Sequence, residues 1–414
     1  MKHLLIHAML LLPLVTLGQE TLTLDACYQL INANHPFEQQ SGLLERQNDL
    51  DLEVINTGKL PKLDMEAQAI YLSDVTQVPF SSVEPLNNDQ YRATFSANQL
   101  IYAGGSIDAS LKARSAALRT QQKQVEVHLY QLKKQVNQLY FSILFAREKR
   151  ALFIAKDEQL EAQSKEVKSG IRNGTILPAS DKVLQAELLK IERQLIEVRH
   201  NEISLFQTLS SLVGKSLDPR TTLEYPVIDV NAQATGNRPE WALFELKKEH
   251  IESSDLLLSK QRAPKVFGFA SGGYGNPGLN MLDNSFQTFY TVGVKLNWNI
   301  FDWEANQKKR ASLLVNKELV DNEVQIFELN TQIELSQQQS EIEKLTAFIT
   351  SDLASIELRK EVLKAAESQL KNGVITSSAY VTELTNLFED ENTLRMHRIQ
   401  LALMKANYNT TKGH

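Results

Sequence analysis

Eight histidines and one cysteine are the residues of this sequence best suited to hold a metal ion or to take part in covalent catalysis. No pair of histidines has the spacing that a zinc site needs. The sequence also contains no serine–histidine–aspartate set, phosphate-binding loop or glycine-rich nucleotide fingerprint. Cys27 has no disulfide partner within the chain, and a lone cysteine is more often a small buried apolar residue than a reactive thiol. The sequence therefore predicts a protein that is not an enzyme and that holds no metal ion or cofactor.

The charge balance and the first residues of the chain indicate where it works. The 414-residue chain has a formal net charge of −6, which is too small to indicate a nucleic-acid partner. Residues 1–19 have the layout of a signal peptide, because Lys2 precedes an apolar run over residues 4–17 that is too short to span a membrane. We therefore expect an exported protein that is cleaved near residue 19.

A strand that passes directly into a very long helix dominates the second half of the chain. Residues 290–300 alternate between apolar and polar side chains, as a strand with one apolar face does. No glycine or proline lies between Gly293 and Gly373, so we expect one helix of about 65 residues, or about 100 Å. The apolar residues of the strand, expected to face lipid, are Val292, Val294, Leu296, Trp298 and Ile300.

The same succession of strand and helix occurs about 200 residues earlier, which indicates a duplicated unit. Matches at several separate anchors follow two constant shifts, which is difficult to obtain by chance. The change between the two shifts implies a hairpin loop four residues shorter in the second copy. The matched pairs are Pro61–Pro264 and Tyr71–Tyr274 at a shift of 203, and Ile101–Ile300 and Gly174–Gly373 at a shift of 199.

The expected organisation is two repeats, each made of a helix, a β-hairpin, a long helix and a returning helix. The first repeat covers residues 20–213 with its hairpin at about 63–102, residues 214–236 form an irregular linker, and the second repeat covers 237–414 with its hairpin at about 265–301. We expect four strands and about six helices, the first helix unbroken from Thr23 to Gly58. Heptad spacing predicts helix-on-helix seams at Leu129, Val136 and Ile143 and at Leu387, Leu394 and Leu401.

Four strands are too few for a closed sheet in a membrane. After the signal peptide the chain has no apolar stretch of 18 residues, so a membrane-spanning form requires a closed β-barrel. Each predicted strand has about 10 residues, which suits a tilted transmembrane strand, but the smallest such barrels have about eight strands. Unpaired strand edges are not tolerated in lipid, so several copies of the chain are expected to contribute to one barrel.

In order and duplication these segments resemble the TolC-like outer membrane efflux proteins, over essentially the whole mature chain. The resemblance implies a mainly helical homotrimer, in which three chains of four strands form a 12-strand outer membrane β-barrel that continues as a 12-helix periplasmic α-barrel. The segments that carry it are Leu22-Thr23-Leu24-Asp25-Ala26, Asn34-His35-Pro36, Leu60-Pro61-Lys62, Leu100-Ile101-Tyr102-Ala103-Gly104-Gly105 and Trp298-Asn299-Ile300-Phe301-Asp302.

The resemblance also implies a function and a set of sites. It implies passive export through the outer membrane and periplasm of a Gram-negative bacterium, coupled to a periplasmic adaptor protein and an inner-membrane pump for efflux or type I secretion. Drug, metal-ion and protein substrates stay open. The implied adaptor-docking tips are Asn173, Gly174 and Thr175, and Asn372, Gly373 and Val374; the strand-to-helix joints are Gly104 and Gly105, and Asp302 and Trp303.

Closure of the periplasmic tip departs from the family pattern. Ala379 and Thr382 stand where well-studied members have gating aspartates, so we expect closure by apolar contacts or by other acids. The family's helix lock also fails to match: Asp181 fits its acidic member, but its tyrosine and arginine partners would fall at Leu370 and Ile375. Glu383 is the nearest alternative acid. Asp181 is equally explained as a first-turn helix residue and Glu383 as a solvated one. The tip glycines also fit left-handed helix caps.

An alternative of another class is a secreted or periplasmic coiled-coil scaffold whose strands form a small soluble sheet. Such a sheet would need a cover over its apolar face, including Val292, Val294 and Leu296.

Overall fold

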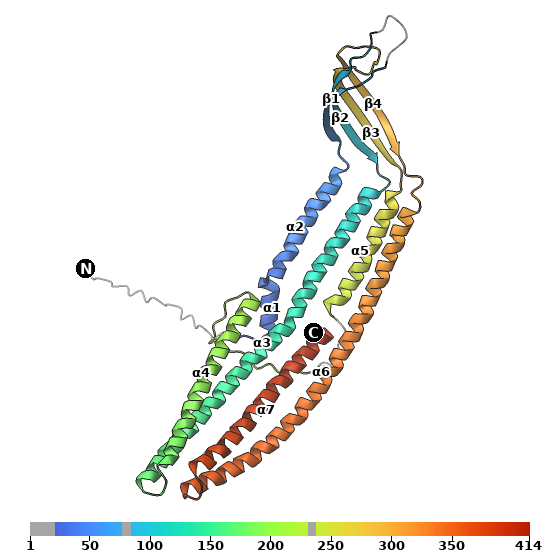
Figure 1. Cartoon of the computed structure of the whole chain (residues 1–414). Helices are drawn as coiled ribbons and strands as arrows, with labels where there is room; N and C mark the ends of the chain where they lie inside the picture. Colours follow the sequence, from blue (N-terminus) through green and yellow to red (C-terminus); the bar gives the residue numbers. More distant parts are fainter. Residues whose placement is uncertain (1–20, 77–83, 231–236) are drawn as a thin grey trace, which may run out of the picture. The chain divides into compact units, whose positions relative to one another are not determined.

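The computed structural model describes residues 21–76, 84–230 and 237–414, and within them it contains seven helices and four strands (Figure 1). The predicted signal peptide, residues 1–19, lies outside the described residues. The elements are α1 (Leu24–Asn34), α2 (Pro36–Thr57), β1 (Lys62–Tyr71), β2 (Asp89–Tyr102), α3 (Ser106–Arg172), α4 (Ala179–Val213), α5 (Pro239–Gln261), β3 (Lys265–Asn276), β4 (Gln287–Asn297), α6 (Ala305–Lys371) and α7 (Ser377–Lys412).

The chain divides into two compact units, and both predicted repeats contribute to each of them. The strand unit comprises Gln39–Val127 and Pro239–Leu329, which include all four strands. The helical unit comprises Met1–Glu38, His128–Arg238 and Asn330–His414, which include α4 and α7. The 67-residue helices α3 and α6 contribute to both units.

The first helix is interrupted, so the prediction of one helix from Thr23 to Gly58 is wrong. Thr23 does cap its start, since its hydroxyl oxygen accepts a hydrogen bond from the Ala26 N–H at 3.0 Å. His35 then adopts an extended conformation (φ −68°, ψ 142°) and separates α1 from α2. The physical reason is Pro36, whose ring disfavours the helical conformation for the preceding residue and suits the first turn of a new helix.

The four strands form one antiparallel sheet in the order β1-β2-β3-β4. The helices of the strand unit follow the same order, α2-α3-α5-α6, and ion pairs join each helix to the next. The sheet and the helix layer therefore each have two uncovered edges, β1 and β4 in one and α2 and α6 in the other (Figure 1). The ion pairs are Asp51–Arg114 at 2.5 Å, Arg119–Glu249 at 2.7 Å and Asp255–Arg310 at 2.8 Å.

The last strand is shorter than its sequence pattern predicts. Its final residue, Asn297, pairs with Lys265, the first residue of β3. Pro264 stands before Lys265 and has no N–H to extend the ladder. Trp298 and Ile300, predicted to belong to the strand, therefore lie beyond the end of β4 in the described chain.

The two strand-to-helix joints have the same backbone conformation but different residues. Gly104 and Gly105 have φ values of 61° and 79°, and Trp303 and Glu304, at the matching positions of the second repeat, have 54° and 62°. Such left-handed conformations cost a non-glycine residue about 1–2 kcal/mol each. The joint residue Asp302 caps the start of α6, because its carboxylate accepts a hydrogen bond from the Asn306 N–H at 3.0 Å.

In the helical unit, α3, α4, α6 and α7 share one apolar core. The predicted heptad positions are buried in the helical unit at Val136 and Ile143 on α3 and at Leu387 and Leu394 on α7, whereas Leu401 is half-buried. Among the described residues, no helix has the combined length and apolar character that a membrane span requires.

Candidate membrane face and hairpin ends

The strand register gathers the apolar side chains of all four strands on one face of the sheet. Alternate residues point to the same face, so the pairs Met65–Phe95, Ala97–Ala270 and Ala270–Val292 extend one face across the sheet. All ten residues of β1 are exposed, and the described residues place no cover over this face. The larger side chains of this apolar face are Leu63, Met65, Tyr71, Tyr91, Phe95, Val266, Tyr274, Tyr290, Val292, Val294 and Leu296.

The exposure of these side chains is unusual for a protein in water. Val292 is 73% exposed, Val294 69% and Leu296 63%. An antiparallel sheet of a soluble protein normally packs its apolar face on a core. The observed face instead has the character of a surface that meets an apolar medium.

The opposite face is largely polar, although it also carries several aromatic residues. It carries Asp64 and Glu66 on β1, Arg92 on β2 and Lys295 on β4. Two aromatic rings on this face lie against glycines of the adjacent strand, Phe289 on Gly273 and Phe269 on Gly293, where an added Cβ would approach each ring to within 2.5 and 2.7 Å. The sheet thus separates an apolar surface from a largely polar one.

Aromatic residues gather at both ends of the apolar face. At the hairpin end the Phe286 ring stacks near Tyr91 and Tyr274, with ring centroids 6.4 and 5.4 Å away. Beyond the helix end of β4, the rings of Phe301 and Trp303 meet edge to face at 4.8 Å and both are exposed. Aromatic residues at the two borders of an apolar band are typical of sheets that cross a membrane, where these residues lie at the headgroup level.

The two edge helices of the strand unit also present unpartnered apolar stripes. Leu43, Leu50 and Val54 of α2 are each more than half exposed. Steps of three, four and seven residues place the members of each stripe on one side of their helix, as in a helix-packing seam. The matching stripe of α6 consists of Val315, Leu319, Ile326 and Leu329, each also more than half exposed.

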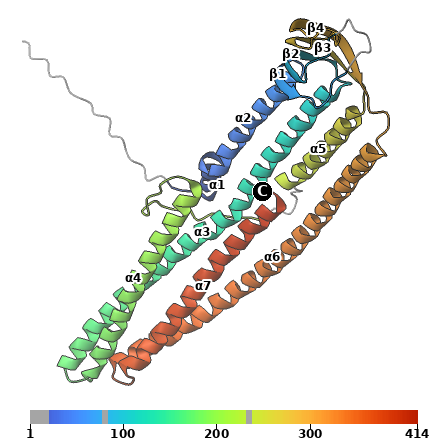
Figure 2. The ribbon, with the colours of Figure 1, turned by 45° about the horizontal axis from the view of Figure 1, so that its top comes forward.

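The two predicted docking tips lie side by side at the ends of the helical hairpins α3–α4 and α6–α7 (Figures 1 and 2). Gly174 and Gly373 both have a φ of 72° and end their helices in the same way, each donating its N–H to the carbonyl three residues earlier while the next residue donates to the carbonyl five residues earlier. A Cβ added to Gly373 would lie 3.3 Å from the Thr175 carbonyl oxygen. The structure therefore brings the tip segments Asn173–Thr175 and Asn372–Val374 together, and both are exposed.

The predicted gate residues have ordinary partners within one chain. Asp181 accepts hydrogen bonds from the Ser164 hydroxyl at 3.2 Å and the Gln185 amide at 2.8 Å. Glu383 lies 3.6 Å from Arg359. Ala379 and Thr382 are both exposed in the first turns of α7.

A buried lysine that the sequence analysis missed joins three helices of the helical unit. The Lys156 ammonium on α3 contacts the Glu187 carboxylate on α4 at 2.9 Å and the Thr385 hydroxyl on α7 at 3.2 Å. The two charged side chains are only 5% and 12% exposed. Burial alone raises the pKa of the Glu187 carboxyl, but the hydrogen bond and charge of Lys156, aided by Lys190, bring that pKa below its usual value. Lys156 is one of 44 lysine and arginine residues, and nothing in the sequence indicates that this one is buried.

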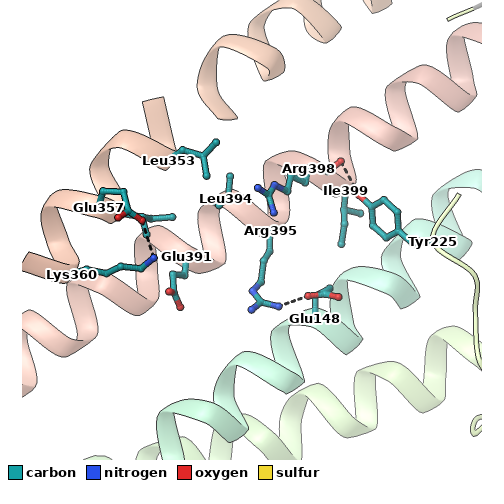
Figure 3. Close-up of a pocket in the computed structure, with 11 residues that line it drawn as sticks. Glu148, Tyr225, Leu353, Glu357, Lys360, Glu391, Leu394, Arg395, Arg398 and Ile399 are labelled. Atoms are coloured by element: carbon teal, nitrogen blue, oxygen red, sulfur yellow. Dashed lines mark hydrogen bonds and ion pairs between the residues drawn. The ribbon is translucent and has the colours of Figure 1, made fainter. Parts of the chain in front are cut away.

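A cavity of about 460 Å³ lies between α3, α6 and α7 in the helical unit (Figure 3). Ion pairs Glu148–Arg395 and Glu357–Lys360 border it, and the Tyr225 hydroxyl donates to the Arg398 carbonyl at 3.3 Å. Its lining also includes the apolar side chains of Leu353, Ile356, Leu394 and Ile399. In the parts of the chain that the structure describes, no group of His, Cys, Asp and Glu side chains is arranged to hold a metal ion.

Comparison with known proteins identifies the fold. No protein-family model matches this sequence. No curated protein matches it either. Solved structures do match: the chain has the fold of the TolC-like outer membrane channels, and the likeness covers 94% of its length.

Three of these structures illustrate the likeness. The outer membrane protein VceC from Vibrio cholerae is 15% identical, with a TM-score of 0.67 over 96% of its own chain. The outer-membrane channel OprN is 13% identical, with a TM-score of 0.69 over 90%. The MtrE outer membrane channel of Neisseria gonorrhoeae, solved in its open state, is 14% identical, with a TM-score of 0.67 over 88%.

The Lys156–Glu187 pair gives a test of how the helical unit is held together. Lys156→Met leaves a buried carboxylate short of its main partner and is expected to lower the free energy of unfolding by about 3–5 kcal/mol at pH 7. Because the pKa of Glu187 is lowered in the folded chain, its stabilising contribution is present above the usual carboxyl range and is lost as the pH falls through that lowered pKa. The deficit should therefore shrink on acidification.

Thermal unfolding of the purified protein between pH 7 and pH 3 measures this deficit. The double variant Lys156→Met/Glu187→Leu is the matched control and should recover most of the loss, since both charges are then absent. A double variant no more stable than Lys156→Met would contradict the assignment.

Proposed function

We propose that this protein is an outer membrane channel: the passive export duct of a tripartite efflux or type I secretion system. The observation that carries the proposal is the uncovered apolar face of the sheet, which has aromatic residues at both borders and a polar face behind it. A single sheet with an apolar and a polar face suits a wall between lipid and water. The fold shared with VceC, OprN and MtrE supports the same function.

The uncovered edges support a homo-oligomer that closes on itself. Each chain offers β1 and β4 at the sides of its sheet and α2 and α6 at the sides of its helix layer. In a ring, β4 of one copy pairs with β1 of the next and the apolar stripe of α6 meets that of α2, so no edge stays open to lipid. Three copies supply 12 strands, well above the minimum of about eight, and 12 is the number that the family resemblance implies.

The remaining assignments follow from this proposal. The signal peptide directs the chain through the inner membrane, the sheet lies in the outer membrane of a Gram-negative bacterium, and the helices extend into the periplasm. The tip segments Asn173–Thr175 and Asn372–Val374 receive a periplasmic adaptor protein that is coupled to an inner-membrane pump. The gate at the tip does not use an aspartate ring, since Ala379 and Thr382 occupy those positions.

The coiled-coil scaffold is the second candidate, and imaging separates the two. Single-particle electron microscopy of detergent-extracted protein is expected to give a three-fold particle with a short closed cylinder of strands and a hollow ring of helices. Compact monomers, or solid fibres released without detergent, would refute the channel and favour the scaffold.

The orientation of β4 is tested by a charge on its apolar face. Val294→Arg puts a guanidinium into lipid and is expected to cost about 2–4 kcal/mol of stability near the bilayer midplane. Thr291→Arg on the polar face of the same strand is the control and should assemble normally. Urea titration of the membrane-embedded oligomer measures both, and equal stabilities would show that β4 is assigned the wrong facing.

The docking assignment is tested at Gly373. Gly373→Trp places an indole on the tip and is expected to leave the oligomer intact while abolishing export, measured as substrate accumulation in cells. Gly373→Ala carries the same backbone penalty of about 1–2 kcal/mol without the bulk, and it should retain export. Loss of the oligomer in the Trp variant, with the Ala variant intact, would move Gly373 from the docking tip to a structural role.

A further inference from the structure

Four tyrosines on the apolar face of the sheet lie on a regular diagonal. Tyr71 of β1 pairs with Asp89, so Tyr91 stands two residues further from the hairpin end on β2. The next steps repeat this offset, because Tyr91 pairs with Asn276 and Tyr274 pairs with Thr288. The tyrosine of each strand, Tyr71, Tyr91, Tyr274 and Tyr290, is thus displaced by two residues relative to that of the strand before it.

A constant displacement of this kind is expected for tilted strands that cross one boundary plane. Tyrosines prefer the membrane interface, so a row of them marks one depth, and strand tilt converts one depth into a fixed stagger between neighbouring strands. The diagonal of tyrosines therefore gives the stagger between neighbouring strands of this sheet, which is two residues per strand. A closed ring repeats one stagger around its circumference.

We propose that β4 pairs with β1 of a second copy in the register that continues this diagonal. The inference rests on the proposed oligomeric channel and adds the arrangement at its seam. A further step of two residues sets Val292 opposite Tyr71 of the neighbouring copy, Val294 opposite Ala69 and Leu296 opposite Ala67. The antiparallel ladder then continues to Trp298 opposite Met65 and Ile300 opposite Leu63.

This register accounts for a segment that has no strand partner in the described part of its own chain. Residues 298–301 extend past Lys265, the first residue of β3, and form no ladder with it. In the proposed register the ten residues of β1, Lys62–Tyr71, find ten partners in residues 292–301 of the neighbour. The apolar–polar alternation that continues to Ile300 thus has a structural role, at the seam between copies.

Side-chain chemistry at the seam is consistent with the register. The apolar face combines large and small partners, Leu296 with Ala67 and Val294 with Ala69. On the polar face Asn297 stands opposite Glu66, which brings the carboxylate diagonally next to Lys295. In the described chain Lys295 and Glu66 are on opposite edges of the sheet, so only a second copy brings them together.

Disulfide cross-linking in the full-length protein tests the register. In a Cys27→Ser background, the double variant Val294→Cys/Ala69→Cys places one thiol on each edge of every copy. Mild oxidation in outer membranes is expected to convert it into a covalent ring, seen as a single trimer band on non-reducing gels. The matched control, Val292→Cys/Ala69→Cys, represents pairing without stagger, in which Tyr290 would stand opposite Tyr71, and it should remain monomeric on the gel.

Each outcome bears on one of the two proposals. Ring formation by the control pair, or by neither pair in oligomers verified by native mass measurement, would overturn the register and leave the channel standing. Absence of any oligomer in the unmodified protein would overturn the channel itself. The Lys295–Glu66 pair across the seam gives a second readout. Lys295→Glu alone should weaken the oligomer, and adding Glu66→Lys in the same chain should restore it.

Discussion

The hydrogen-bonding demand of strand backbones is the constraint on which the rest of this structure depends. In the described part of the chain, the N–H and C=O groups of β1 and β4 that point away from the sheet have no neighbouring strand to pair with. In water such groups are solvated, but the apolar face beside them is suited to lipid, where each unsatisfied group costs several kcal/mol. This demand is the physical basis of the proposed ring of copies.

The helices do not have this unmet hydrogen-bonding demand at their edges. Their backbones are satisfied internally, so their edges need only apolar contact, and the stripes on α2 and α6 offer it. Within the strand unit, ion pairs such as Asp255–Arg310 join neighbouring helices of one copy. Within the helical unit, an apolar core and the buried Lys156 join the helices. These polar contacts thus lie between helices of one chain, while the exposed stripes of α2 and α6 are apolar.

Sequence reasoning succeeded where structure is set by local chemistry. Glycine positions placed the ends of the long helices, and heptads identified buried residues such as Val136 and Ile143. It failed at His35 because the helix was drawn from its cap at Thr23 to Gly58, and the steric effect of Pro36 on the preceding residue was given too little weight. The end of β4 was missed for another reason: alternation reports the surroundings of a strand, whereas its hydrogen-bonded length depends on a partner far away in the sequence. The burial of Lys156 could not be predicted from the sequence, because it depends on how three separate helices pack around the charged group.

The two strand-to-helix joints show how differently one backbone shape constrains later substitution. At Gly104 an added Cβ would come within 2.1 Å of the Ala263 Cβ, and φ is positive, so only glycine fits without distortion. At Trp303 the same turn is made by an exposed side chain, at a backbone cost that the flanking strand and helix impose. Under the predicted duplication, substitution at the first joint is therefore limited by both sterics and φ, whereas at the second joint it is limited by the backbone cost of a positive φ. The residues at the two joints are thus expected to diverge at unequal rates, although both joints form the same turn.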